Sequence, residues 1–182
     1  VAGFLTSGAT ESTLRGGLAA RERAAAERGI TEQLVEGIEQ LQEQYGVEHV
    51  RRSTTSALIA AGLGDDEPQV AAAAEFTAAV LQMAQAVGAE FGLSLSVRAG
   101  IAAGDVASGV IGERQLAFSM WGEPVTMAFS LASLARAGEI LVDEAVRDAL
   151  ESGWDVEVRE GLLGLDDTVE AWAVRPPKAS DA

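Results

Sequence analysis

Hydrophobic positions repeat along the chain with two different periods, and the change between them separates predicted helices from predicted strands. One helix with a buried face is indicated by apolar residues at three- and four-residue steps: Ile30, Leu34, Ile38, Leu41 and Tyr45. Thr31 is suited to cap its start. The charged, alanine-rich run over residues 18–28 predicts a separate exposed helix, which Gly29 ends.

A second buried helical face ends near Glu90, and Pro68 lies close to the start of that helix. Its apolar residues are Phe76, Val80, Met83 and Val87. Shorter helices are predicted over residues 122–135 and 144–150. Gly138 is suited to end the first of these as a C′ glycine.

Short apolar runs between turn residues predict strands over residues 1–5, 47–53, 56–63, 93–102, 106–111, 139–142, 154–159 and 168–174. Residues 6–17 are small and polar and predict a loop. Because hairpins alternate with helices, we expect an α+β sandwich with a mixed, mostly antiparallel sheet and helices on one face. Residues 1–175 are assigned to one domain, and residues 176–182 are expected to form a disordered tail.

Composition narrows the possible functions. The net charge of -15 argues against nucleic acid and anionic membranes as partners, because their phosphates would be repelled. The absence of cysteine excludes disulfides and thiolate metal sites. No apolar run reaches the length of a membrane span, so we expect a cytoplasmic domain without membrane contact of its own. The chain begins with Val1 rather than Met, and we expect it to belong to a longer protein, which leaves room for a membrane tether outside it.

Glycines at fixed spacings form the most specific motif. The run R-x-G-I-x-x-G-x-V-x-x-G-x-x-G is present as Arg98, Gly100, Ile101, Gly104, Val106, Gly109 and Gly112. The run W-G-x-x-V-x-x-A is present as Trp121, Gly122, Val125 and Ala128. The match extends to four further segments: Gly62-Leu63, GEILV, residues 162–164 and the closing VEAWAV. Phe4 anchors its first strand. This pattern resembles the catalytic domain of class III adenylyl and guanylyl cyclases over nearly the whole chain, apart from residues 7–29.

The resemblance implies a ferredoxin-like βαβ core and an added arm through which such domains pair head to tail. Residues 112–124 match that arm, and large apolar side chains lie close together there: Leu116, Phe118, Met120 and Trp121. Groups of this kind usually mark interfaces, so we expect a homodimer or a heterodimer with another cyclase domain. The alternative is that Phe118 and Trp121 pack into the core of their own chain.

The family holds two divalent metal ions with one aspartate after the first strand and another in the following hairpin. The matching positions here are Thr6 and Thr55, and no aspartate occurs before Asp65. Mg²⁺ and Mn²⁺ require anionic oxygen ligands, which a hydroxyl cannot replace. Glu11 is the only acid nearby and is more simply a solvated loop residue. The resemblance therefore implies an empty metal site and no bound cofactor.

The other catalytic positions of the family are altered as well. Its transition-state arginine and ribose-orienting asparagine match Ser130 and Thr126, and its base-reading lysine and aspartate match Arg51 and Ser119. The chain has no asparagine that could substitute. Arg136 lies more than a helical turn beyond the functional position and is more simply a surface charge near a helix end.

We therefore expect a catalytically silent domain that dimerises and relays or receives a signal. Two alternatives stay open: an atypical active cyclase completed by a partner, and a metal-free sensor in which residues 51–56 bind a nucleotide or another small anion. Other polar groups have simpler explanations as strand-surface, capping or turn residues: His49, Asp65, Asp66, Glu67, Asp166 and Asp167.

Overall fold

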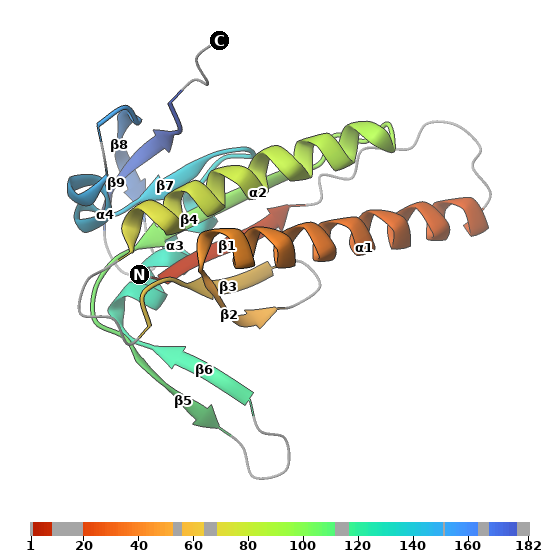
Figure 1. Ribbon diagram of the computed structural model, residues 1–182. Helices are drawn as coiled ribbons and strands as arrows, with labels where there is room; N and C mark the ends of the chain where they lie inside the picture. Colours follow the sequence, from red (N-terminus) through yellow and green to blue (C-terminus); the bar gives the residue numbers. More distant parts are fainter. Residues whose placement is uncertain are drawn as a thin grey trace.

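The computed structural model describes residues 2–8, 20–52, 56–63, 69–111, 117–150, 152–163 and 168–177. Within them, seven strands form one sheet in the order β2-β3-β1-β4-β7-β9-β8 (Figure 1). These strands are β1 Ala2–Gly8, β2 Glu48–Arg52, β3 Ser56–Ala60, β4 Ser96–Ala102, β7 Ile140–Val142, β8 Asp155–Leu163 and β9 Thr168–Arg175. Only β4 and β7 pair in parallel among these neighbours, so the expected mixed, mostly antiparallel sheet is confirmed.

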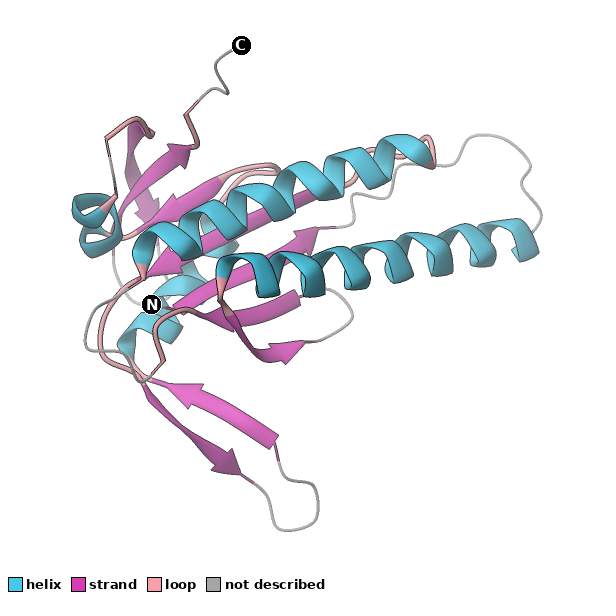
Figure 2. Ribbon diagram, viewed as in Figure 1, coloured by secondary structure: helices cyan, strands magenta, loops and turns pink. Residues whose placement is uncertain are grey.

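Helices cover both faces of the sheet (Figure 2). On one face lie α1 (Ala20–Tyr45), α2 (Val70–Glu90) and α4 (Glu144–Ala149), and on the other lies α3 (Glu123–Leu134). Strand β3 shows the division, because Ile59 packs into the cluster formed with α2 and Leu58 into the cluster formed with α3. The expected α+β class is confirmed, but the expectation of helices on one face is wrong. A strand that is apolar on both sides requires cover on both.

Helix α1 is continuous through Gly29, so the predicted break there is wrong. A Cβ atom at Gly29 would lie 3.3 Å from the Phe91 ring, and one at Gly37 would collide with Met83. These glycines let α1 pack closely against α2, and this packing offsets the poor helix propensity of glycine, about 1 kcal/mol. Thr31 lies inside α1 and therefore does not cap its start.

Other predicted boundaries also shift. Strand β1 continues through Thr6 to Gly8, where a loop was expected, while residues 9–17 lie outside the described part of the chain. Helix α3 ends at Leu134, so Gly138 is not its C′ residue. Gly138 instead forms the turn before β7, with φ of 77°, and its N–H donates to the Val97 carbonyl at 2.9 Å.

Helix α2 is long and apolar enough to cross a membrane, which corrects the expectation that no run has that length. However, 56% of its most apolar stretch is buried inside the molecule. Phe76 and Ala74 have no exposed surface and lie in the main hydrophobic cluster, together with Ile101 of β4. The burial of α2 is therefore that of a core helix.

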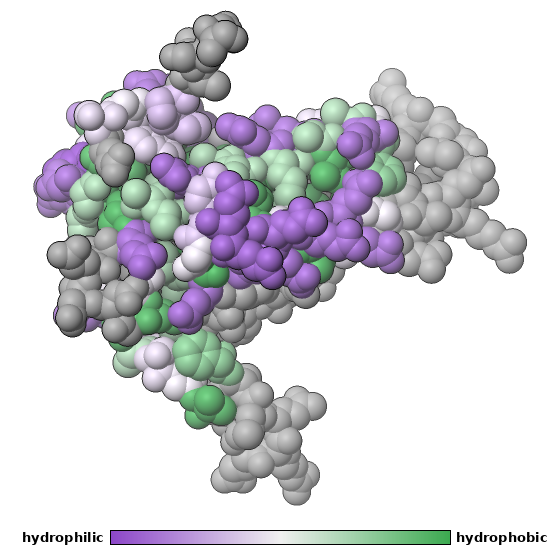
Figure 3. Space-filling model, viewed as in Figure 1, coloured by the Kyte–Doolittle hydropathy of each residue, from purple (hydrophilic) through white to green (hydrophobic). Residues whose placement is uncertain are grey.

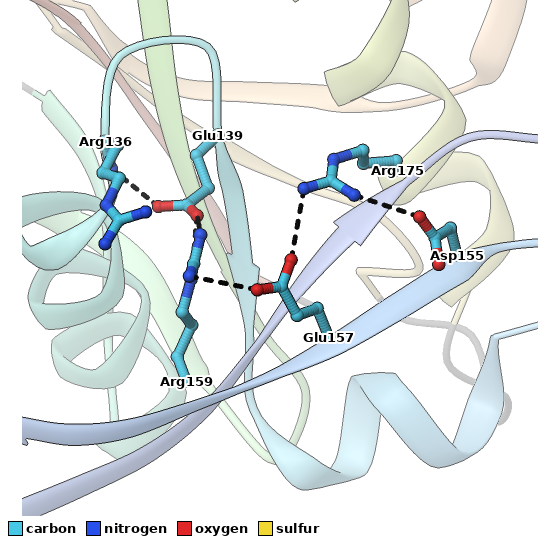
Figure 4. Close-up of polar contacts among 6 residues, drawn as sticks. All are labelled: Arg136, Glu139, Asp155, Glu157, Arg159 and Arg175. Carbon is cyan, nitrogen blue, oxygen red and sulfur yellow. Dashed lines mark hydrogen bonds and ion pairs between the residues drawn. The ribbon is translucent and has the colours of Figure 1, made fainter.

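Ion pairs tie the last strands together on the α3 side of the sheet (Figure 4). Arg159 of β8 donates to Glu139, which precedes β7, and also contacts Glu157 at 3.3 Å. Arg175 of β9 bridges Glu157 at 3.2 Å and Asp155 at 3.0 Å. The pair of Arg159 and Glu139 is the least exposed of these contacts, so it is the one whose loss should be felt most.

Two opposing effects set the pKa of Glu139. Burial raises the pKa of this carboxyl, but the backbone N–H of Arg136 donates to it at 2.8 Å and the Arg159 guanidinium favours its charged form. The hydrogen bonds and charges outweigh the burial, so the pKa is lowered from its ordinary value.

Candidate functional site

Thr6, at the first predicted metal-ligand position, lies in β1 between two partner strands. It pairs with Ser56 of β3 on one side and with Arg98 of β4 on the other. Thr55, the second metal-ligand position, lies outside the described residues, but it directly precedes Ser56. The sheet therefore brings β1 at Thr6 beside the start of β3 at Ser56.

Ser56 and Arg98 lie on the same face of the sheet, because both are directly opposite Thr6. Alternation along their strands identifies this as the face that α3 covers, since Leu58 and Ala102 belong to the α3 cluster. Both residues are half-buried. The neighbours of position 6 at this face are thus a hydroxyl and a guanidinium, neither of which is an anionic metal ligand.

Within the part of the chain that the structure describes, no three His, Cys, Asp or Glu side chains gather closely enough to hold a metal ion. Several acids considered from the sequence fall outside that part: Glu11, Asp65, Asp66, Glu67, Asp166 and Asp167. His49 lies in β2 and pairs with Ile59 of β3, and its side chain is not among those that the structure describes.

The start of α3 is fixed by close contacts. Gly122, with φ of 142°, precedes the helix, and a Cβ atom there would lie 2.9 Å from the Asp105 carbonyl oxygen. Pro124 occupies the first turn, where its missing N–H costs nothing. The inner face of α3 meets β4 at Gly100, where an added Cβ would come within 2.3 Å of the Ala128 carbonyl. Little freedom remains to rotate or slide this helix.

Thr126 and Ser130 lie four residues apart on α3, so they share one side of the helix. Thr126 is exposed and Ser130 half-buried. Both side chains are short and uncharged, in contrast to the family's asparagine and arginine. Arg136 cannot take the place of Ser130, because it lies beyond the last residue of α3 and is exposed.

Arg51 and Ser119, the predicted base-reading positions, lie on strands that contact each other. Arg51 is in β2, and Ser119 is in β6 (Ala117–Trp121). Of residues 51–56, the candidates for anion binding, the structure describes the strand backbone at Arg51 and Arg52 and the half-buried Ser56, while residues 53–55 lie outside the described part. The fold thus brings together the two strands that carry the predicted base-reading positions, which hold an arginine and a serine.

Strand β6 was not predicted from the sequence. It pairs with β5 (Ala107–Ile111) as a two-stranded arm that projects from the sheet (Figure 1). The available signal was a short β-prone run after a polar segment, which reads equally well as the end of a loop. The arm itself was expected from the resemblance at residues 112–124, and residues 112–116 lie outside the described part.

Large apolar side chains are exposed on the arm (Figure 3). Phe118 is 40% exposed, Trp121 44% and Val110 64%. Val110 and Phe118 lie directly opposite each other, so they form one continuous apolar surface. Met120 is instead buried, in the cluster that includes α3. Phe118 and Trp121 therefore do not pack into the core of their own chain, and Leu116 lies outside the described residues.

Comparison with known proteins decides the family. The sequence profile of the adenylate and guanylate cyclase catalytic domain matches residues 17–164. The chain belongs to this family. Adenylate cyclases of Mycobacterium bovis and Mycobacterium tuberculosis are 28% identical to this cyclase homology domain over 130 residues, which cover 71% of the chain and 29% of each relative. The chain thus spans less than a third of the length of these relatives.

Solved cyclase domains share the fold. The guanylate cyclase domain of RhGC from Catenaria anguillulae, in complex with GTP, superposes with a TM-score of 0.80 at 16% identity, covering 97% of this chain and 96% of that one. The adenylyl cyclase CyaB from P. aeruginosa gives a TM-score of 0.78 at 16% identity, covering 100% and 95%. The guanylyl cyclase domain of RhoGC from Blastocladiella emersonii, also similar, has been solved both as a monomer and as a dimer.

Proposed function

We propose that this cyclase homology domain is catalytically silent and acts by pairing with another cyclase domain within a signalling protein. The observation that carries the proposal is the surroundings of Thr6. The fold sets this position next to the Ser56 end of the hairpin, as the resemblance to the family requires, yet the neighbours are Ser56 and Arg98. A preserved framework has lost the charges that its chemistry uses.

Cyclisation joins the ribose 3′-oxygen to the α-phosphorus and expels pyrophosphate. Two divalent ions would activate the hydroxyl and neutralise the triphosphate, and they need anionic oxygens that Thr6 and Thr55 do not supply. The developing charge also lacks a guanidinium at Ser130. In related phosphoryl transfers, one such arginine contributes about 10³–10⁵ in rate. The two deficits act on different parts of the transition state, so neither compensates for the other.

The exposed arm supports pairing. Phe118, Val110 and Trp121 leave apolar area in water, which an isolated domain gains nothing by exposing. Large aromatic side chains of this kind commonly carry interface energy. A second copy of the chain or another cyclase domain would cover them. We expect sedimentation velocity over a concentration series to detect a dimer, and a strict monomer at high concentration would contradict the pairing role.

Metal-dependent nucleotide binding tests the empty site. Titration of Mn²⁺ in the presence of a non-cyclisable ATP analogue should give no saturable binding to the unmodified chain. The double substitution Thr6→Asp and Thr55→Asp should create saturable Mn²⁺ binding, because it returns carboxylates to both of the family's metal-ligand positions. Saturable Mn²⁺ binding by the unmodified chain that is lost on Thr55→Ala would contradict the proposal.

A further inference from the structure

A cavity of about 250 Å³ lies on the sheet face opposite α3, away from the cyclase site. It forms where four segments distant in sequence meet: the end of α1, the middle of α2, the turn before β8 and the residues after β9. Tyr45, Trp154 and Pro177 supply apolar walls, while Glu75 and Gln82 supply polar ones. The resemblance to cyclases assigns no role to these residues.

Two aromatic side chains line this cavity and are held in place by the core. The rings of Tyr45 and buried Phe76 form a T-shaped contact, with centroids 6.4 Å apart and planes at 80°. Trp154 is half-buried and packs against the same hydrophobic cluster. Both rings are therefore pre-organised, so little conformational entropy would be lost on binding a ligand.

The charge of the lining is negative. Glu75 is exposed and is the charged residue among those that line the cavity, and it has no ion-pair partner within the described part of the chain. Arg175 lines a neighbouring cavity, but its guanidinium is held by Asp155 and Glu157. The net charge of -15 adds a long-range attraction for cations.

We propose that this cavity binds a small organic cation that carries a quaternary or alkylated ammonium group. Aromatic rings attract such cations through their π faces, and the Glu75 carboxylate supplies the opposite charge. The volume lies below the about 300–1,000 Å³ typical of sites for drug-sized ligands, so the ligand is small. A bound cation would contact α1, α2 and the flanks of β8 and β9 together. Its binding would therefore stabilise the packing of these elements against one another.

Choline and its neutral isostere 3,3-dimethylbutan-1-ol form a matched pair of probes, because they differ in charge but hardly in shape. The indole N–H resonance of Trp154 in heteronuclear NMR spectra reports occupancy, and Trp154→Leu assigns the resonance. Choline should shift it saturably, and the neutral isostere should bind about tenfold more weakly or not at all. Lys178 follows Pro177 directly in sequence, so a Lys178→Ala chain is titrated in parallel as a control for any effect of its ammonium group.

The substitution Glu75→Gln removes the charge and keeps the shape of the side chain, and it should weaken choline binding several-fold. Glu90→Gln is the control, because Glu90 is an exposed glutamate on the same helix that does not line the cavity. The proposal is overturned if choline gives no saturable shift in either the unmodified or the Lys178→Ala chain. Equal binding of both probes, or unchanged choline affinity in Glu75→Gln, overturns it as well.

Discussion

Gly100 lies at a close contact between β4 and α3, and this contact explains why a glycine is needed there. Its position in β4 faces the backbone of α3, where a Cβ atom would lie 2.3 Å from the Ala128 carbonyl oxygen and 2.4 Å from the Ala132 nitrogen. Backbone atoms cannot turn aside as a flexible side chain can. A glycine at this point of the motif is therefore required by packing, whatever the chemistry of the site.

We predict that Gly100→Ala lowers the free energy of unfolding by about 1–3 kcal/mol or more, which is the usual cost of overpacking a core. In a chain of this length, that lowers the Tm by several degrees. Gly109→Ala is the control, because its Cβ would meet the Trp121 ring at an ordinary 3.7 Å. Thermal unfolding followed by circular dichroism measures both, and equal Tm values would contradict the contact.

Glu139 gives a pH prediction. Its pKa is lowered in the folded state by Arg136 and Arg159, so its contribution to stability is present above the ordinary glutamate pKa of about 4.3 and is lost as the pH falls further. The free-energy difference between the unmodified chain and Glu139→Gln should therefore shrink as the pH falls from neutrality towards 3. Urea denaturation at several pH values measures it. A constant difference would show that the charge of Glu139 contributes nothing.

Helices and strands can be predicted from local sequence only where the tertiary contacts favour the same structure as the local pattern. The periodicity of residues 30–45 and 76–87 predicted both long helices correctly, because each buries one face. Gly29 misled the prediction, since its low helix propensity is outweighed by the contact with Phe91. Strand β6 was missed because its five residues, AFSMW, are too few and too irregular in apolar and polar alternation to mark a strand.

The arm offers a matched pair of substitutions on one strand. Met120→Ala should cost about 2–5 kcal/mol, because Met120 is buried in the core. Phe118→Ala should change stability by only about 0.5 kcal/mol, because Phe118 is exposed in the single chain. It should nevertheless weaken self-association in sedimentation. If Phe118→Ala lowers the Tm as much as Met120→Ala, the arm packs against its own chain.

At the scale of the whole molecule, the fold could be predicted because the glycine spacings mark its closest contacts. Gly100 and Gly122, two of these glycines, lie where an added Cβ atom would meet the backbone of α3 and of Asp105. The pairing of Thr6 with Ser56 places the first predicted metal-ligand position beside the start of β3, whereas Thr55 lies outside the described residues. The cavity beside Tyr45 and Trp154 could not be predicted, because no local pattern shows that distant segments meet.

Restoring the metal ligands alone should not restore the enzyme. The variant Thr6→Asp/Thr55→Asp should gain Mn²⁺ binding but remain at least ~10³-fold slower than a chain that also carries Thr126→Asn and Ser130→Arg. The reason is that α3 would still present two neutral hydroxyl groups to the developing charge. Cyclic nucleotide formation by the two variants, measured in parallel, distinguishes them. Equal rates would show that Thr126 and Ser130 matter little.

Turnover by the unmodified protein tests the central claim most directly. Purified chain is incubated with ATP or GTP and with Mg²⁺ or Mn²⁺, and cyclic AMP and cyclic GMP are quantified by mass spectrometry. A Thr55→Ala variant serves as the control for contaminating cyclases. We expect no product above the level of that control under any of the four conditions. Cyclic nucleotide formation by the unmodified chain that Thr55→Ala abolishes would contradict it.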